Sequence, residues 1–341
     1  MSRKAVIQAI ATHLPERTLS NEELAAEFGN RWSAEKIHAK TGILTRGVAA
    51  PGECASDLGV AAAQKLLDGG AVAREDVDFL LFCTQSPDYF LPATACTMQS
   101  RLGLRSRCGA LDFNQGCSGF VYGLSLAKGL IESGSAGNVL LVTAETYSKH
   151  IHPKDASTRV LFGDGAAAVL VGAQDAQVDR IGPFVFGTDG HGACELAVPA
   201  GAFRCPPGPE TVIESADNDG NIRTPQNLYM NGPEIFNFTL RTIPSLVSTL
   251  LHEAGLEKDA VDYYVFHQAN RFMLEHLRRK IGIPDEKFCI NLESYGNTVS
   301  ATIPMALEIA LARGDVRPGA RVMVVGFGVG YSWAAALLSL I

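Results

Sequence analysis

Several features that would assign this chain to a particular class of protein are missing from its sequence. Its cysteines form no C-x-x-C pair and no spacing typical of zinc ligands. No apolar run approaches the ~18 residues that a membrane span requires. Residues 1–16 contain neither a long apolar stretch nor a signal cleavage site. We therefore expect free thiols in a reducing cytoplasm, without a membrane span or a bound metal.

A strongly basic composition is also absent. The 341 residues include 29 Lys and Arg against 36 Asp and Glu, which gives a net charge of −7. A field of that sign does not attract nucleic acid or an anionic membrane, so an acidic partner would need a local basic patch. With 47% hydrophobic and 19% charged residues, the chain has the composition of a globular protein with a large core. Its length fits two domains or one large layered unit.

The apolar runs that are present alternate with helical periods, which predicts an α/β protein. They also repeat: "VDFLLF" at residue 77 returns as "VDYYVF" at 261, and "NVLLV" at 138 as "RVMVV" at 321. Between them, "GCSGF" at 116 aligns with "GNTVS" at 296. We infer two related halves, residues 1–175 and 176–341, with a central site where Cys117 faces Asn297. The segment 187–228 fits neither half, and we expect it to cover the site entrance.

Cys117 lies in "FNQGCSGF", between a predicted strand and a predicted helix, with Gly116 before it and Gly119 shortly after. Gly116 would relieve the strain of a tight turn. The N-terminus of a helix stabilises a thiolate, which predicts a lowered pKa for the Cys117 thiol. The Cys117 N–H would then help to hold an oxyanion. A buried thiol beside a turn is the alternative.

Two further motifs carry polar residues at the ends of predicted elements. "FHQAN" places His267 and Asn270 after a strand, where α/β proteins often have a cleft, and "SYGNTVSAT" places Asn297 at the start of a helix. A locally bonded histidine and an N-cap asparagine are the structural alternatives. Cys, His and Asn together suggest acyl chemistry through a thioester. A cysteine hydrolase uses the same residue types, and the spacing does not separate these two cases.

In this order, "FNQGCSGF", "FHQAN", "SYGNTVSAT" and "GFGVGYSW" resemble the 3-oxoacyl-[acyl carrier protein] synthase III family of condensing enzymes. "TGILTR" (41–46), "LPATACTMQSRLGL" (91–104) and "FGDGAAA" (162–168) extend the resemblance over nearly the whole chain. The resemblance implies a thiolase-like α/β fold with a duplicated five-layer α-β-α-β-α architecture. This fold agrees with the internal repeat.

The resemblance also implies catalytic roles. Cys117 would take an acyl group from acyl-CoA or an acyl-carrier protein, and His267 and Asn297 would hydrogen-bond the carbonyl of a malonyl thioester. Decarboxylation then gives a carbon nucleophile, and its attack yields a 3-oxoacyl thioester in fatty-acid, specialised lipid or polyketide synthesis. The N–H groups of Cys117 and Val329 would form the oxyanion hole, with Val329 in place of the usual glycine. No cofactor is implied besides the phosphopantetheine thioester substrates.

Substrate and partner contacts follow from the same resemblance. The positions that contact the substrate in relatives are occupied by Leu91, Tyr147, Gly232, Phe236, Asn270 and Phe327. A basic run on one predicted helix would dock the acidic acyl carrier protein, although a solvated helix face is the alternative. This run consists of Arg271, Arg278, Arg279 and Lys280. The family implies a homodimer in which Leu91, where a relative has Phe, reaches the partner's acyl tunnel.

The sequence departs from the family pattern at the CoA site and in the acyl tunnel. The residues that clamp adenine in relatives correspond to Lys36 and Ala156, while Trp32 and Arg159 lie nearby in the sequence. We therefore expect CoA to bind differently or weakly. Tyr147 replaces a small aliphatic residue, from which we expect a reshaped tunnel.

Two other functions stay open at this point. One is transfer of the Cys117-bound acyl group to an alcohol or amine without malonate, and retention of Asn297 argues against it. The other is a non-catalytic partner subunit of a condensing enzyme, and retention of Cys117 and His267 argues against that.

Overall fold

Two β-sheets form the frame of the molecule. The computed structural model describes residues 2–29 and 32–340. The first sheet has the strand order β1-β7-β6-β4-β5, and the second has the order β13-β14-β15-β8. The strands of the first sheet are β1 (Ser2–His13), β4 (Phe79–Cys83), β5 (Gly109–Phe113), β6 (Asn138–Glu145) and β7 (Gly165–Ala176). Those of the second are β8 (Ile181–Thr188), β13 (Tyr263–Phe266), β14 (Arg321–Gly328) and β15 (Ser332–Ser339).

The two sheets have the same internal order. In the first, β4 is parallel to β6, and β7 runs antiparallel between β6 and β1. In the second, β13 is parallel to β14, and β15 runs antiparallel between β14 and β8. In the first sheet, β5 pairs in parallel with the outer side of β4. At the equivalent position of the second sheet, beside β13, there is only a single parallel bridge between Tyr264 and Phe288. This common order supports the predicted relation between the two halves, and the chain passes from one sheet to the other between Ala176 and Ile181.

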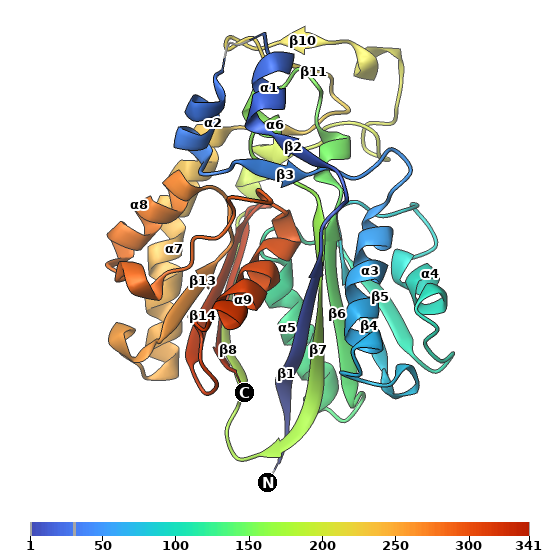
Figure 1. Cartoon of the computed structure of the whole chain (residues 1–341), viewed down its shortest axis with the longest axis vertical. Coiled ribbons are helices and arrows are strands. Elements are labelled where there is room, and N and C mark those ends of the chain that lie inside the picture. Colours follow the sequence, from blue (N-terminus) through green and yellow to red (C-terminus); the bar gives the residue numbers. More distant parts are fainter. Residues whose placement is uncertain (1, 30–31, 341) are drawn as a thin grey trace.

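Helices cover both sheets and fill the space between them (Figure 1). The central layer contains α5 (Gly119–Glu132) and α9 (Thr302–Arg313), the first sheet carries α3 (Ala55–Asp68) and α4 (Thr94–Arg101), and the second carries α7 (Gly232–Ala254) and α8 (Arg271–Ile281). The succession is α-β-α-β-α. Strands covered on both faces are apolar throughout, as in "FLLFC" of β4 and "RVMVV" of β14.

Smaller elements lie at the end of the molecule toward which β4, β6, β13 and β14 point, at the top of Figure 1. They are β2 (Thr18–Ser20), α1 (Asn21–Glu27), α2 (Ala34–Thr41), β3 (Thr45–Gly47), α6 (Ala156–Arg159), β9 (Leu196–Ala197), β10 (Ser215–Ala216), β11 (Ile222–Arg223) and β12 (Tyr229–Met230). Short 3-10 turns comprise Arg74–Asp76, Tyr147–His150, Gly190–Gly192, Pro209–Val212, Lys258–Ala260, Asp285–Lys287 and Val299–Ala301.

The segment 187–228 folds over this same end. It has little regular structure besides β9, β10 and β11, yet Leu196 and Leu228 are buried in the core. It therefore packs onto the carboxyl ends of the strands, where α/β proteins place their sites. Among the described residues, no helix combines the length and apolar character needed to cross a bilayer.

Candidate active site

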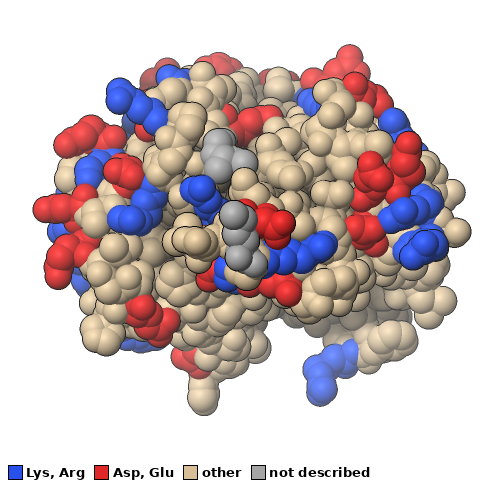
Figure 2. Space-filling view, turned by 90° about the horizontal axis from the view of Figure 1, so that it is seen from below, with Lys and Arg blue, Asp and Glu red and all other residues tan. Residues whose placement is uncertain are grey.

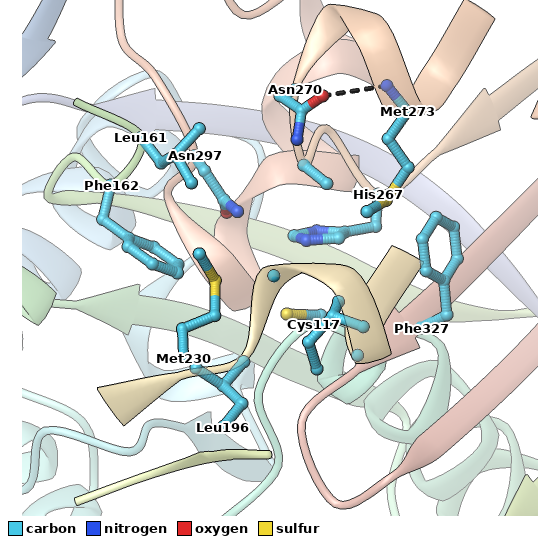
Figure 3. Close-up of a pocket in the computed structure, with 14 residues that line it drawn as sticks. Cys117, Leu161, Phe162, Leu196, Met230, His267, Asn270, Met273, Asn297 and Phe327 are labelled. Carbon is cyan, nitrogen blue, oxygen red and sulfur yellow. Dashed lines mark hydrogen bonds between the residues drawn. The ribbon is translucent and has the colours of Figure 1, made fainter. Parts of the chain in front are cut away.

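Cys117, His267 and Asn297 line one cavity of about 160 Å³. They come from three places: the turn between β5 and α5, the residue after β13, and the loop before α9. Their exposed fractions are 4%, 2% and 5%. Figure 3 shows the thiol, the imidazole and the carboxamide turned toward the same space. The structure thus brings together the three residues that the sequence singles out.

Glycines keep room around the sulfur. A Cβ on Gly328 would lie 2.8 Å from the Cys117 Sγ and 3.0 Å from its Cβ, and Gly328 has a φ of +155°. A Cβ on Gly119 would collide with the Cys83 Sγ. Only glycine therefore lets β14 and the first turn of α5 pack this closely around the thiol.

The Cys117 thiol is neutral in the resting protein. Burial raises its pKa to about 12, and the Glu145 carboxyl adds to the rise, whereas the N–H groups of Val329 and Cys117 oppose it. The predicted lowering of this pKa is therefore wrong, because the loss of water around a buried thiol outweighs the helix N-terminus. The same two N–H groups face the sulfur, so the carbonyl oxygen of an acyl group attached to it lies within their reach when it becomes an oxyanion.

His267 is held from behind by a neighbouring loop. Its Nδ1 lies 2.7 Å from the Oγ1 of Thr302, and the Thr302 hydroxyl lies 3.0 Å from the carbonyl oxygen of Val299. Burial lowers the pKa of His267 to about 3, and the Val299 carbonyl opposes this effect. The imidazole is therefore neutral at ordinary pH, and which ring nitrogen carries the proton decides whether it donates into the cavity.

Asn297 is oriented by Val299, the residue whose carbonyl accepts from Thr302. The Val299 N–H donates to the Asn297 Oδ1 at 2.9 Å, so the Asn297 amide nitrogen is the group left for the cavity. Val299 has a φ of +54°, which is unusual for a β-branched residue. This left-handed conformation lets its N–H serve Asn297 while its C=O serves Thr302 and His267. Strain of this kind persists where surrounding structure fixes it, often at functional sites.

A buried carboxyl lies behind the thiol. Glu145, at the end of β6, accepts hydrogen bonds from the Gln85 N–H and from the Ser86 and Ser300 hydroxyls. Burial raises its pKa to about 8, against the effect of these bonds. The group links β4, β6 and the loop before α9, so it ties together the two halves of the site.

Further predicted substrate residues separate into two groups. Gly232, Asn270 and Phe327 line the same cavity as Cys117. Asn270 also caps α8, because its Oδ1 accepts from the Met273 N–H at 2.8 Å (Figure 3). Phe236 does not line it; its ring packs between α7 and α8, with a centroid 5.5 Å from that of Phe272.

Leu91 and Tyr147 lie elsewhere. Leu91 is 82% exposed in the single chain. Tyr147 is buried, and it lines a second cavity of about 580 Å³ together with Val329 and Leu196. Leu196 also lines the cavity of Cys117, so the two spaces are neighbours.

The outer opening is a wider hollow of about 690 Å³, which shares Leu161, Met230 and Gly232 with the inner cavity. Trp32 lines it, with the Nζ atoms of Lys36 and Lys40 5.1 Å and 4.6 Å from the centre of its ring.

The other residues near the predicted adenine site turn away from this opening. Ala156 is completely buried. Arg159 pairs with Glu27 and lines a separate small cavity with Arg17 and Arg46. An aromatic residue and lysines are thus present at the opening, while Arg159 is not.

The basic run on α8 is only partly free. Arg278 pairs with Asp285 at 3.2 Å, and Arg279 with Glu275 at 3.0 Å. Arg271 and Lys280 are exposed, and Arg271 follows Asn270 directly at the mouth of the cavity. Arg271 is therefore the best placed of the four to meet a partner there.

Elsewhere the surface charges are mixed. On the face seen from below in Figure 2, basic and acidic side chains alternate without a continuous area of one sign. Within residues 2–29 and 32–340, no group of three or more His, Cys, Asp or Glu side chains is arranged to hold a metal. All eight cysteines are free thiols, of which Cys96 and Cys194 are exposed.

Comparisons with known proteins agree with this geometry. The model of the family described as 3-Oxoacyl-[acyl-carrier-protein (ACP)] synthase III matches residues 111–190, and the model of its C-terminal part matches residues 251–340. A beta-ketoacyl-[acyl-carrier-protein] synthase III of Caldanaerobacter subterraneus subsp. tengcongensis is 36% identical, with 98% of this chain and 97% of that protein covered. The beta-ketoacyl-[acyl-carrier-protein] synthase III 3 of Streptomyces coelicolor is 39% identical, with 99% of this chain and 98% of that protein covered.

Solved structures give the same result. A 3-oxoacyl-(acyl-carrier-protein) synthase III superposes with a TM-score of 0.97 at 54% identity, covering 99% of this chain and 100% of that one. The priming beta-ketosynthase of the R1128 polyketide pathway superposes with a TM-score of 0.85 at 29% identity, covering 99% and 97%. The predicted thiolase-like α/β fold is confirmed. With its duplicated sheets and its full-length relatives, the chain belongs to the 3-oxoacyl-[acyl carrier protein] synthase III family.

Proposed function

We propose that the protein is a decarboxylating condensing enzyme, an acyltransferase that joins an acyl group on Cys117 to a malonyl-carrier thioester. The observation that carries the proposal is the shared cavity. It places a thiol beside two backbone N–H groups and opposite an imidazole and a carboxamide. The product is a 3-oxoacyl thioester for fatty-acid, specialised lipid or polyketide synthesis.

In the first half-reaction, Cys117 exchanges thioesters. The sulfur attacks the acyl carbonyl, the N–H groups of Cys117 and Val329 hold the tetrahedral oxyanion, and the departing carrier thiol takes the proton that Cys117 loses. A neutral thiol suits this exchange, because the proton leaves only when substrate is present. Stabilisation of the oxyanion in this step does not require His267 or Asn297.

In the second half-reaction, the malonyl thioester loses CO₂ and leaves an enolate. The Asn297 amide and the Nε2–H of His267 stabilise its oxygen, provided that Thr302 donates to Nδ1 so that the proton lies on Nε2. The enolate carbon attacks the acyl-Cys117 carbonyl. The same oxyanion hole serves again, and the Cys117 sulfur leaves and recovers a proton.

We further propose how substrates and partners reach the site. The arm of phosphopantetheine would pass Trp32 and Gly232 and reach Asn270, which all line the opening or the inner cavity. Acyl carrier protein would dock at the start of α8 around Arg271, and no other cofactor is needed. We also propose that the protein forms a homodimer, because the exposed Leu91 suits a contact with a second copy. Its free thiols suit a location in the cytoplasm.

The test is to mix the protein with an acyl thioester and malonyl-acyl carrier protein, and to measure CO₂ and the 3-oxoacyl product. Both are expected from the native chain, whereas Cys117→Ala should give no 3-oxoacyl product, because no acyl-Cys117 can form. Loss of acyl groups from Cys117 to an alcohol or amine, with every malonyl thioester inert, would instead indicate simple acyl transfer.

A further inference from the structure

The second cavity lies next to the cavity of the nucleophile. A Cβ on Gly116, the residue before Cys117, would lie 2.6 Å from the Gln85 Oε1 and would also collide with the Val329 side chain. Gln85 and Val329 both line the cavity, and so does Tyr147. Leu196 lines both this cavity and the one that holds the Cys117 sulfur, so an acyl group on that sulfur lies next to this space. We call this space the acyl chamber; it is lined by Gln85, Pro87, Phe90, Asn114, Tyr147, His150, Leu196, Ala197, Val198, Ala200, Gly201, Ala202, Gln226, Leu228 and Val329.

The size of the acyl chamber suits a substantial acyl group. Its volume of about 580 Å³ lies within the ~300–1,000 Å³ that small-molecule sites occupy. Leu196, Leu228 and Val329 give it apolar walls. At its rim, the exposed rings of Phe90 and Phe203 lie 5.7 Å apart. A hydrocarbon chain therefore finds apolar surface, but not on every side.

The rest of the acyl chamber is lined by polar groups that still have a hydrogen-bond donor or acceptor without a partner among the described residues. The Tyr147 hydroxyl donates to the Gln85 Oε1 at 2.5 Å, which leaves the two N–H donors of that carboxamide. Within the described part of the chain, the Gln85 amide nitrogen has no hydrogen-bond partner. Burial lowers the pKa of His150, against the effect of the backbone of Gln85, so its neutral ring offers one N–H donor and one nitrogen acceptor. The imidazole edge lies against the Tyr147 ring, 5.8 Å between centres.

A purely saturated acyl chain matches this lining poorly. Each buried donor or acceptor that loses water without a new partner costs ~1–3 kcal/mol. No Lys, Arg, Asp or Glu is among the residues that line the acyl chamber, so a charged acyl group finds no counter-ion. The lining fits a neutral group that both donates and accepts hydrogen bonds.

We propose that Cys117 accepts acyl groups that carry a neutral oxygen substituent, a hydroxyl or a ketone, which Gln85 and His150 hydrogen-bond within the acyl chamber. This inference rests on the proposed function and names its substrate class. Gln85 and His150 act here as specificity-determining residues. The apolar walls hold the rest of the chain.

The experiment measures acylation of Cys117 by intact-protein mass spectrometry. Acyl-CoA substrates are used in pairs of equal length, one saturated and one with a hydroxyl or ketone at successive positions along the chain. The native protein should react at least about tenfold faster with one oxygenated member than with its saturated partner, the effect of one good hydrogen bond. Equal or faster reaction of the saturated chain in every pair overturns the inference.

Variants locate the effect. Gln85→Leu and His150→Leu should each remove the preference while the saturated chain still reacts. If either variant folds poorly, Tyr147→Phe is tested in its place, because it keeps the aromatic ring and removes only the hydroxyl that donates to Gln85. Gln64→Leu makes the same exchange on the exposed face of α3 and should keep the preference. A preference that survives both Gln85→Leu and His150→Leu would place its cause elsewhere and refute the assignment.

The outcome is separable from that of the proposed function. CO₂ release and condensation with saturated acyl groups alone would sustain the function and reject the substrate class. Selective acylation by oxygenated chains without CO₂ release from any malonyl thioester would sustain the substrate class and reject the condensation.

Discussion

The His267 Nδ1 and the Thr302 Oγ1 lie 2.7 Å apart, and the single Thr302 proton has two acceptors within reach, that nitrogen and the Val299 carbonyl. If the hydroxyl donates to Nδ1, the neutral ring carries its proton on Nε2 and donates into the cavity. If it donates to Val299, Nδ1 keeps the proton and Nε2 is only an acceptor. Rotation of one hydroxyl thus links the two tautomers.

Thr302→Val removes the donor to Nδ1 and leaves the Val299 carbonyl, which accepts only from an Nδ1–H. We expect condensation to fall ~10–100-fold, the usual loss for a group that orients a histidine. Acylation of Cys117 should stay within a small factor of the native rate. Thr302→Ser should restore condensation, and ¹⁵N chemical shifts of His267 should move toward the Nδ1–H tautomer in Thr302→Val alone. Equal losses in both half-reactions would point to a merely structural role.

Asn297→Asp keeps the shape of the side chain but changes its charge. One oxygen still accepts from the Val299 N–H, and the other turns a negative charge toward the place where the enolate forms. We expect condensation to fall ~10²–10³-fold, as for loss of an oxyanion donor, while Cys117 still becomes acylated. Asn218→Asp makes the same change of charge on the surface and should leave both rates unaltered. Undiminished CO₂ release from Asn297→Asp would remove the carboxamide from the mechanism.

Gly328→Ala should block the first half-reaction. The added Cβ meets the Cys117 Sγ at 2.8 Å, and the backbone φ of +155° disfavours any side chain. We expect acylation to become undetectable, with a loss of ~1–3 kcal/mol in the free energy of unfolding, measured in urea. Gly129→Ala is the matched control on α5, where a Cβ meets nothing within 4 Å, and it should stabilise the protein by ~0.5–1 kcal/mol. Normal acylation of Gly328→Ala would contradict the described packing.

Glu145→Gln should change how stability depends on pH. Burial raises the pKa of Glu145 from 4.5 to about 8, so between these values the folded chain holds a proton that the unfolded chain has released. This carboxyl therefore makes stability fall as pH rises through that window, by up to about 1.4 kcal/mol per pH unit. Above the window its effect is constant.

Urea unfolding of native and Glu145→Gln protein at a series of pH values isolates this contribution as the difference between the two curves. The native curve should drop relative to the variant as pH increases, and the curves should run parallel above about pH 8. The exposed residue Glu75, changed to Gln, provides the control. Parallel curves throughout would show that Glu145 ionises normally.

The fold and the three central residues could be predicted because each leaves a local pattern. "FLLFC" and "RVMVV" are apolar throughout since both sheets are covered on both faces, and their repetition indicates the duplicated order. Cys117, His267 and Asn297 stand at strand ends or helix starts, in motifs that the family shares.

What the sequence did not show depends on contacts between distant segments. Thr302 and Val299 follow Asn297 within one motif, but nothing local indicates that they face His267 or that Val299 has a positive φ. The direction of the Cys117 pKa was mispredicted because burial in the assembled protein exceeds the local effect of α5. Phe236 lies only one helical turn from Gly232, yet α8 holds its ring away from the cavity.

The burial of Cys117 has a practical consequence for anyone who labels this protein. Bulky maleimide dyes should tag Cys96 and Cys194 at the surface and pass over the 4%-exposed nucleophile. A fluorescent signal on the purified enzyme would then say nothing about its activity. A probe shaped like the pantetheine arm, with an electrophile at its tip, should mark the one sulfur that matters.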